Sequence, residues 1–548
     1  MKKKLFSIIM CALMVMCLMP SMAFAEGGAT EVADLNALKT ELAKESPVSV
    51  KLTSDIENIG EIITIDGGKS VTIDLNGHTI SFAEGDFFYL KHGTLELKGE
   101  GTVKEATPKY APVIVAGSKT STDADYSTLT VGKNVTLSGW DGIQIDYAGK
   151  SEEGNNHAYG VVVTVNGTLK ANYDGDQAGS GIWINGDIKD TEGCVPKITL
   201  SDTSKIDASG QTGIYAAGYA EWTLEGDITA GQAVTAKSGK ITINKGTYTS
   251  EGDGTKASAY DIPRDYATGS AYTGAAVGIT SNDNYAKKLD LVINDGTFKS
   301  AYDWAVYEGI GKYEDGTMAA TSSYATVAIN GGDFEGYTEL DKKGDAVRVT
   351  NAAEKNVITG GTFNADPTNY VAEGYQAVEN NDGTWSIEPK TLTSIAITVK
   401  EPEIGKTPDY DYTWTVKSKD SGDSQVSFWL KIAKDKYEEG VFDNGWEVVG
   451  EKEKFQKDYY YMFVTAFEPK DGYRIGDEDP TATVNGKEAI VSVQNDRTTA
   501  YVIKIYGPLT EEAKSPATGD NSELGLFAVA GLISAVGVAL VLRRKQSM

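Results

Sequence analysis

The acidic and basic side chains of this 548-residue sequence do not form a recognisable catalytic set. Abstracting a proton beside a uronate needs a positioned base and a group that stabilises the developing charge. Between residues 47 and 390 the only arginines are Arg264 and Arg348, no Asp-Asp pair occurs, and His92 is the one histidine followed by glycine. We therefore predict no catalytic residues, although the many carboxylates leave an acid–base pair of the glycosidase kind open.

Residues that bind metals are scarce in this sequence. The three histidines lack zinc-ligand spacing, and Cys194 is the only cysteine after residue 17. The run from Asn172 to Asp176 begins like a calcium loop, but Trp183 occupies the position of the closing glutamate. We predict no metal and no cofactor, with a calcium site at this run as a weaker alternative.

Aromatic side chains recur in the middle of the chain. Exposed rings can stack on sugar rings and anchor a contact. This pattern favours adhesion or carbohydrate binding, and the alternative is that many of the rings point into a core or shield corners. The candidate sugar-binding residues are Trp140, Tyr147, Trp183, Tyr215 and Trp222, accompanied by Tyr173, Tyr219 and Trp304.

A repeated unit must position these residues. Its form is a short apolar strand, an Asn/Gly corner and an apolar residue that starts the next strand, and Asn and Gly tolerate the positive φ that a sharp corner needs. One such unit cannot bury its apolar side chains, whereas a stack of units can. Copies lie at residues 75–80, 165–169, 184–188, 224–228, 241–248, 293–298, 329–334 and 358–363.

Two classes of strand alternate along residues 47–390. One class is alternately apolar and polar, as in Val161 to Val165. The other class places Gly or Ala before Val or Ile, as in Gly142-Ile143, Gly181-Ile182 and Ala276-Val277. This alternation is expected when each coil lays its strands on different faces of one prism.

The run Val71 to Ile80 and the closing segment Tyr370 to Trp385 make the fold specific enough to name a resemblance. Residues 47–390 resemble the right-handed parallel β-helix of the pectin-lyase-like superfamily, in particular its surface-protein members in Gram-positive bacteria. The superfamily's enzymes cleave acidic polysaccharides. Trp183 to Gly186 is similar to the Trp-Ile-Asp-His of some lyases, but Asn185 and Gly186 replace the two charged residues.

We predict a further structural element on each side of the β-helix in the sequence, a helix before it and a β-sandwich after it. Val32, Leu35, Leu38 and Leu42 have helical spacing, so we predict a helix within residues 26–46 that covers the open first coil. Residues 391–509 carry longer alternating strands and predict an antiparallel sandwich. This region resembles the small Ig-like modules that follow β-helices in bacterial surface proteins.

The first 25 residues have the pattern of a secretory signal peptide. Three lysines precede an apolar run that ends in an Ala-x-Ala site, so we expect cleavage between Ala25 and Glu26. The apolar run is short for a membrane span. With one cysteine left, the secreted chain has no disulfide framework.

The C-terminus has three parts in a fixed order. Residues 510–523 form a polar spacer that contains Ser515-Pro516-Ala517-Thr518-Gly519, residues 524–542 are apolar and long enough to cross a bilayer, and residues 543–548 are basic. This order resembles the sortase sorting signal of Gram-positive cell-wall proteins. The resemblance implies cleavage between Thr518 and Gly519 and attachment to peptidoglycan, with Ser515 where the family usually has leucine. The alternative is a plain membrane anchor.

The net charge of −27 makes nucleic acid an unsuitable partner. We therefore predict an all-β, extracellular protein that is anchored to the cell wall and is non-catalytic. Its predicted partners are sortase, peptidoglycan and a glycan or host-surface ligand. Two alternatives stay open. One is a polysaccharide lyase or glycoside hydrolase of the same superfamily, and the other is a structural spacer on the cell surface.

Overall fold

The three-dimensional structure is a computed structural model. In the described part of the chain, no helix has the length and apolar character that a bilayer crossing requires. The expected span at residues 524–542 lies outside the described residues. The structure describes residues 28–117, 126–145, 160–172, 179–184, 195–252, 274–281, 289–310, 325–337, 345–350, 355–414, 427–439, 441–442 and 445–511.

The chain divides into two compact units. The first comprises residues 1–327 and 334–351, and the second comprises residues 328–333 and 352–548. The described part of both units is nearly all β-structure.

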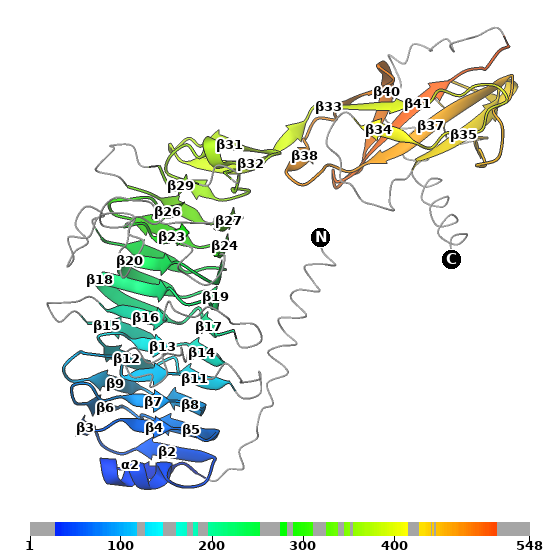
Figure 1. Ribbon diagram of the computed structural model, residues 1–548. Coiled ribbons are helices and arrows are strands. Elements are labelled where there is room, and N and C mark those ends of the chain that lie inside the picture. Colours follow the sequence, from blue (N-terminus) through cyan, green and yellow to red (C-terminus); the bar gives the residue numbers. More distant parts are fainter. Residues whose placement is uncertain are drawn as a thin grey trace. The chain divides into compact units, whose positions relative to one another are not determined.

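Three ladders of parallel strands build the first unit, and each turn of the chain adds a strand to every ladder (Figure 1). We call them the first, second and third ladders in the order in which the chain passes through them. This arrangement is consistent with a parallel β-helix. The first ladder contains β1 (Thr30–Val32), β2 (Val48–Leu52), β5 (Lys69–Asp74), β8 (Gly93–Lys98), β11 (Ser127–Val131), β14 (Val161–Val165), β17 (Lys197–Leu200), β19 (Glu221–Leu224), β21 (Lys240–Ile243), β24 (Asp290–Ile293) and β27 (Thr326–Ile329).

Two long strands take part in both of the other ladders. Their first halves belong to the second ladder and their second halves to the third. These strands are β18 (Lys205–Ala216) and β20 (Asp227–Ala236).

The second ladder also contains β3 (Ile56–Ile59), β6 (His78–Phe82), β9 (Gly101–Glu105), β12 (Val135–Gly139), β15 (Thr168–Ala171), β22 (Thr247–Ser250), β25 (Thr297–Ser300) and β28 (Asp333–Glu335). The third ladder also contains β4 (Ile63–Ile65), β7 (Phe88–Leu90), β10 (Val113–Val115), β13 (Ile143–Ile145), β16 (Ser180–Ile184), β23 (Val277–Ser281), β26 (Val306–Ile310) and β29 (Val347–Val349).

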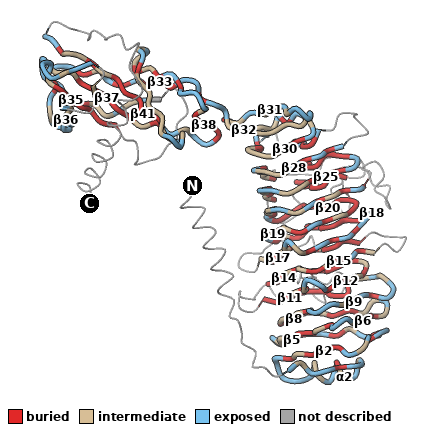
Figure 2. The backbone as a smooth tube through the Cα atoms, turned by 180° about the vertical axis from the view of Figure 1, so that it is seen from behind, coloured by how far each residue is buried: buried red, intermediate tan, exposed pale blue. Residues whose placement is uncertain are grey.

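Residues with buried side chains, red in Figure 2, recur on the strands of successive coils. Their side chains form apolar stacks in the interior of this unit. In the first ladder, Leu129, Val163, Ile198, Trp222 and Ile241 follow one another in register and are all buried. Burying each such side chain contributes roughly 1.5–3 kcal/mol, so these stacks stabilise the packing of successive coils.

The last residue of the repeated corner unit forms an aromatic stack inside the second ladder. The Phe298 ring centroid lies 5.0 Å from that of Tyr248 and 4.9 Å from that of Phe334, with nearly parallel planes. Tyr248 and Phe298 are fully buried. The sequence unit predicted an apolar residue at this point, and stacking of successive coils turns it into a continuous column.

Three glycines at the start of third-ladder strands lie in close contact with the neighbouring coil. A Cβ atom on Gly142 would lie 2.6 Å from the Gly181 carbonyl oxygen and 2.9 Å from Leu169 Cβ. Gly181 and Gly213 are equally tight, against Ile206 and Ile228. The second sequence class therefore marks the corner where the second ladder meets the third.

The start of the first unit differs from the expected helix. The helix α2 occupies only Leu35–Leu42, because the Asp34 carboxylate accepts the Ala37 backbone N–H at 2.8 Å and starts it there. The preceding residues form β1, in which Thr30 pairs with Val50 of β2. Leu38 of the helix is fully buried. The predicted helix within residues 26–46 is therefore limited to Leu35–Leu42, and Val32 of the predicted helix face lies in β1 instead.

The second unit begins with a hairpin and continues into an eight-stranded sheet. The hairpin strands β31 (Tyr375–Glu379) and β32 (Trp385–Leu392) are antiparallel, and β32 then pairs in parallel with β38 (Tyr473–Ile475). Two short elements precede the hairpin, β30 (Thr362–Phe363) and η2 (Thr368–Tyr370), and the short 3-10 helix η4 (Lys434–Lys436) follows β35 (Ser427–Ala433). The eight strands are, in spatial order, β34 (Tyr412–Trp414), β33 (Ser394–Val399), β39 (Thr481–Val484), β40 (Lys487–Val493), β41 (Ala500–Tyr506), β37 (Tyr459–Phe467), β35 (Ser427–Ala433) and β36 (Glu447–Val448).

The strand β40 joins the two halves of this sheet. Its first residues pair with β39 and its last residues pair with β41. The core between the halves includes Trp429, Phe463 and Tyr506. The expectation of a wholly antiparallel sandwich is wrong at β33, which pairs in parallel with β39 because the chain runs through other strands before it returns beside β33.

Candidate functional site

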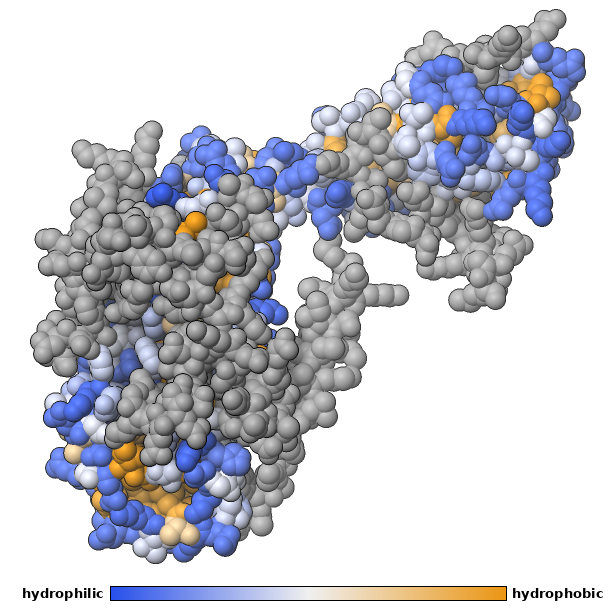
Figure 3. All heavy atoms as spheres, viewed as in Figure 1, coloured by the Kyte–Doolittle hydropathy of each residue, from blue (hydrophilic) through white to orange (hydrophobic). Residues whose placement is uncertain are grey.

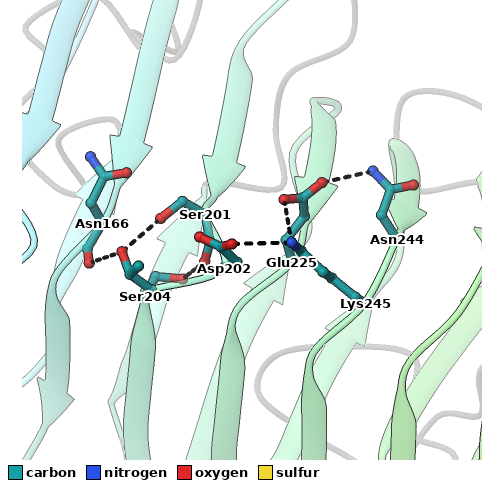
Figure 4. Close-up of polar contacts among 8 residues, drawn as sticks. Asn166, Ser201, Asp202, Ser204, Glu225, Asn244 and Lys245 are labelled. Carbon is teal, nitrogen blue, oxygen red and sulfur yellow. Dashed lines mark hydrogen bonds and ion pairs between the residues drawn. The ribbon is translucent and has the colours of Figure 1, made fainter. Parts of the chain in front are cut away.

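The Asn/Gly corners between the first and second ladders carry a chain of polar contacts (Figure 4). Lys245 Nζ lies 3.1 Å from an Asp202 carboxylate oxygen and 3.7 Å from one of Glu225, and Asn244 Nδ2 donates to Glu225 at 3.3 Å. The hydrogen bond to Asp202 raises the pKa of Lys245. These side chains are largely exposed, so each ion pair contributes little to stability. The corner is a polar edge that joins successive coils.

The corner contacts tolerate very different coil lengths. Glu225 and Asn244 are 19 residues apart, whereas Asn244 and Asn294, whose side chains are hydrogen-bonded at 3.0 Å, are 50 residues apart. The extra residues leave the ladder register intact, which is the usual behaviour of surface insertions.

The outward-facing row of the first ladder is polar. Successive coils place Thr130, Thr164, Thr199, Thr223 and Thr242 opposite one another. A neighbouring row alternates in charge through Lys197, Glu221, Lys240 and Asp290. Opposite charges and paired threonines are favourable cross-strand neighbours. The second ladder is similar, with Thr102, Thr136 and Thr168 in one outer row.

The outward-facing row of the third ladder has a different composition. Aromatic and apolar side chains replace most of the threonines and charges, and an arginine ends the row. In register order the row is Thr64, Tyr89, Ile114, Gln144, Trp183, Tyr215, Thr235, Gly278, Tyr307 and Arg348.

An apolar cluster covers the part of this face nearest α2. Phe87, Ala111 and Ile114 are buried there, with Tyr89 and Tyr110 partly buried against them. The Phe87 ring meets the Tyr89 ring edge-on, with centroids 6.2 Å apart. Figure 3 shows the corresponding hydrophobic patch over β4 and β7. Apolar surface gathered on one face of a soluble unit is typical of an interaction site.

The predicted sugar-binding aromatic residues fall into different places. Trp183 is half-buried on the outer row of the third ladder, and Tyr215 occupies the next position but is only 7% exposed. Trp140 is half-buried at the corner before β13, and its Nε1 is buried without a hydrogen-bond partner among the residues that the structure describes. Tyr147 lies outside the described residues.

Trp222 was wrongly assigned to a sugar-binding surface. It is 2% exposed and lies in the interior stack of the first ladder, between Ile198 and Ile241. The reason is strand alternation: Trp222 occupies the inward position of β19, and Thr223 the outward one. Trp304 is likewise buried, but at the corner before β26, where its ring stacks on Tyr307.

Sequence reasoning missed several residues of this face, including Tyr89, Tyr307 and Arg348. The signal was available in the second class of strands, since each of these residues follows directly on the first buried residue of a short third-ladder strand. Alternation gives the side of the strand, but only the register gives the row.

A buried carboxyl group lies at the corner that leads into this face. Asp141 is 7% exposed, and one of its oxygens accepts the Ser180 backbone N–H at 2.6 Å. Burial raises the pKa of the Asp141 carboxyl to about 7, against the effect of this hydrogen bond, and the charge of Glu105 adds to the rise. Glu105 itself is mostly buried and accepts backbone N–H groups of Gly85, Lys109 and Tyr110. Both carboxyl groups satisfy backbone donors at corners.

Metal ligands are not gathered anywhere in the described part of the chain. No group of three or more His, Cys, Asp or Glu side chains could hold an ion there. Residues 173–178, which include most of the calcium-like run, lie outside it.

The comparison with known families bears on the end of the chain. A family model described as the LPXTG cell wall anchor motif matches residues 516–547. The protein is attached to the cell wall of a Gram-positive bacterium. Attachment of this kind implies processing by sortase and a link to peptidoglycan. The five residues Ser515 to Gly519 lie outside the described residues, and the match begins one residue after Ser515.

No curated protein and no solved structure matches the chain. The wall location therefore comes from the C-terminal motif, and any role for the coils must be argued from their own geometry.

Proposed function

We propose that this wall-anchored protein binds a glycan on the outer face of the third ladder, without turnover. The observation that carries the proposal is the contrast between outer rows: threonines and charges on the first and second ladders, and Tyr89, Ile114, Trp183 and Tyr215 on the third. All three ladders have the same kind of apolar inner row, so packing of the coils does not require this difference.

The spacing of the row suits an extended ligand. Consecutive coils of a parallel ladder lie about 4.8 Å apart. On this row the rings of Tyr89 and Trp183 are half-buried, whereas those of Tyr215 and Tyr307 are buried. Tyr89 and Trp183 therefore offer the ring surfaces, and aromatic side chains combine an apolar ring face with polar edges. A polysaccharide has the matching chemistry, with apolar C–H faces and polar hydroxyl edges on each ring.

For the fold, we propose the right-handed β-helix of the pectin-lyase-like superfamily over residues 47–390, capped by residues 26–46. The three parallel ladders support this assignment. Residues 391–509 would then form an Ig-like stalk between the coils and the wall.

For export and anchoring, we propose cleavage between Ala25 and Glu26 and between Thr518 and Gly519, with residues 524–542 held in the membrane until sortase acts. Thr518→Ala should move the protein from the wall fraction to the membrane or the medium. An unchanged wall fraction would contradict this assignment of the cleavage site.

Glycan binding is tested with the purified full-length protein on an array of plant, host and bacterial polysaccharides. Trp183→Ala should weaken binding of the best ligand by about tenfold, since loss of one stacking contact corresponds to roughly 1.4 kcal/mol. The matched control is Thr199→Ala, an outward residue of the first ladder. Binding by no polysaccharide, or equal loss in both variants, would overturn the proposal.

The same incubations test the competing function of a polysaccharide lyase or hydrolase. Asp141 favours that alternative in one respect, since a carboxyl group protonated near neutral pH has the pKa of a general acid. Its burial and its hydrogen bond to Ser180 instead indicate a corner role. Release of new short oligosaccharides would establish turnover. Absence of both binding and products would favour the structural spacer.

A further inference from the structure

The arginine at the end of the third-ladder row is held against an aromatic ring. The Arg348 guanidinium carbon lies 4.6 Å from the centroid of the Trp304 ring. Trp304 is buried, and it stacks on Tyr307 with ring centroids 5.2 Å apart. Arg348 itself is exposed, on the strand next to Tyr307. The ring stack therefore supports a cation at the surface in a defined position.

The two carboxylates that adjoin Trp304 and Tyr307 in the chain accept backbone N–H groups. Asp303 is fully buried and accepts the Trp304 backbone N–H at 2.8 Å. Glu308 is also fully buried and accepts the Thr350 backbone N–H at 2.9 Å. Within the described residues, the interaction that the Arg348 side chain makes is the cation–π contact with Trp304. Arg348 therefore forms no ion pair with a described carboxylate, in a chain whose net charge is −27.

Two exposed tyrosines lie on adjacent turns at the corner that leads to Trp304. Tyr302 is 37% exposed and Tyr337 is 57% exposed, the two largest exposed aromatic surfaces among the described residues. The Tyr337 backbone N–H donates to the Asp303 carbonyl oxygen at 2.7 Å, so both tyrosines belong to the corner that leads to Trp304. Gly309 leaves room for Tyr307, because a Cβ atom there would collide with the Tyr307 hydroxyl group.

We propose that Arg348, Tyr302 and Tyr337 form a subsite for an anionic sugar unit, one that carries a carboxylate or a phosphate ester. A planar guanidinium presents parallel N–H donors that match these two groups, and the tyrosines supply ring faces for the sugar. This inference rests on the proposed glycan binding and adds the charge of the ligand and the residues that select it.

The experiment measures binding of three matched probes to the full-length protein: an oligosaccharide with one uronic acid, the same oligosaccharide with its carboxyl reduced to an alcohol, and a phosphate ester of the reduced form. We expect the two charged probes to bind at least about tenfold more tightly than the neutral one. Arg348→Ala should remove that preference, because it takes away the guanidinium group that distinguishes the charged probes from the neutral one. Arg348→Lys should recover only part of it, since lysine keeps the charge but lacks the planar donors.

The control variant is Lys170→Ala, which removes one exposed positive charge from the second ladder of the same unit. It should leave the affinities for all three probes unchanged. That result would show that the effect of Arg348→Ala comes from a local contact and not from the change in the net charge of the chain. Tyr302→Ala and Tyr337→Ala should weaken the binding of all three probes.

The outcomes separate this inference from the broader proposal. Equal binding of charged and neutral probes, or a preference that survives in Arg348→Ala, would overturn the anionic subsite while glycan binding stands. An equal effect of Lys170→Ala and Arg348→Ala would also overturn it. Binding of none of these probes, together with none of the arrayed polysaccharides, would overturn both.

Discussion

The first and third ladders of the coil unit have the same interior and different exteriors. Inside, Leu129 and Val163 of the first ladder correspond to Ile143 and Ile182 of the third, and all four are fully buried. Outside, threonines line the first ladder, whereas the third carries rings and an arginine. Coil packing restricts the inner row of every ladder, so the outer row is where one face can differ from another. Three changes test this separation.

The largest effect is expected from breaking an inner row. Phe298→Ala removes the middle ring of the stack with Tyr248 and Phe334 and should lower the free energy of unfolding by about 3–5 kcal/mol. Urea denaturation measures it. The control is Lys299→Ala, the next residue on β25, which faces outward and makes an exposed ion pair with Glu335 at 3.6 Å. It should cost less than about 1 kcal/mol. Similar losses in both variants would contradict the division into inner and outer rows.

A pH-dependent effect is expected at the corner that leads to the aromatic face. The folded-state pKa of Asp141, about 7, is above its ordinary value of 3.8. Between these two values the unfolded chain has released a proton that the folded chain retains, so this group lowers the free energy of unfolding as pH rises through that window. Asp141→Asn keeps an acceptor for Ser180 and removes the titration.

We therefore expect Asp141→Asn to gain stability over the parent protein from pH 4 to pH 7, by up to a few kcal/mol, with no further gain above pH 7. One pKa unit corresponds to about 1.4 kcal/mol. Urea denaturation of both proteins at pH 4, 5.5, 7 and 8 measures the difference. A constant difference at all four values would show that the Asp141 carboxyl does not carry the shift.

The smallest effect is expected on the polar outer face. Thr199→Ala removes one hydroxyl between Thr164 and Thr223 and should change the free energy of unfolding by less than about 1 kcal/mol. Glycan binding should be unchanged. A loss of binding as large as that of Trp183→Ala would assign a ligand to the first ladder and remove the contrast between the two faces.

Much of the fold follows from local sequence. The corner unit at residues 241–248 predicts a strand, a corner and an apolar residue that starts the next strand, and at this position the structure has the buried Tyr248. The Gly before the third-ladder strand β13 marks a close approach between coils, because a Cβ atom at Gly142 would collide with the Gly181 carbonyl oxygen and with Leu169. Expectations failed where a neighbour far away in the chain decides the outcome. Examples are Trp222, whose ring fills the interior of the first ladder, and the pairing of β33 with β39.

By itself the sequence determined the short-range features: alternating strands, Asn/Gly corners, the division of classes between ladders, and the C-terminal anchor motif that places the protein on the wall. The tertiary structure alone decided which residues share a row. Neighbouring coils differ in spacing from 19 residues at Glu225 and Asn244 to 50 at Asn244 and Asn294. Strand register is set by backbone hydrogen bonds between coils, not by distance along the chain, so Trp183, Tyr215 and Arg348 become one face only once the coils have stacked.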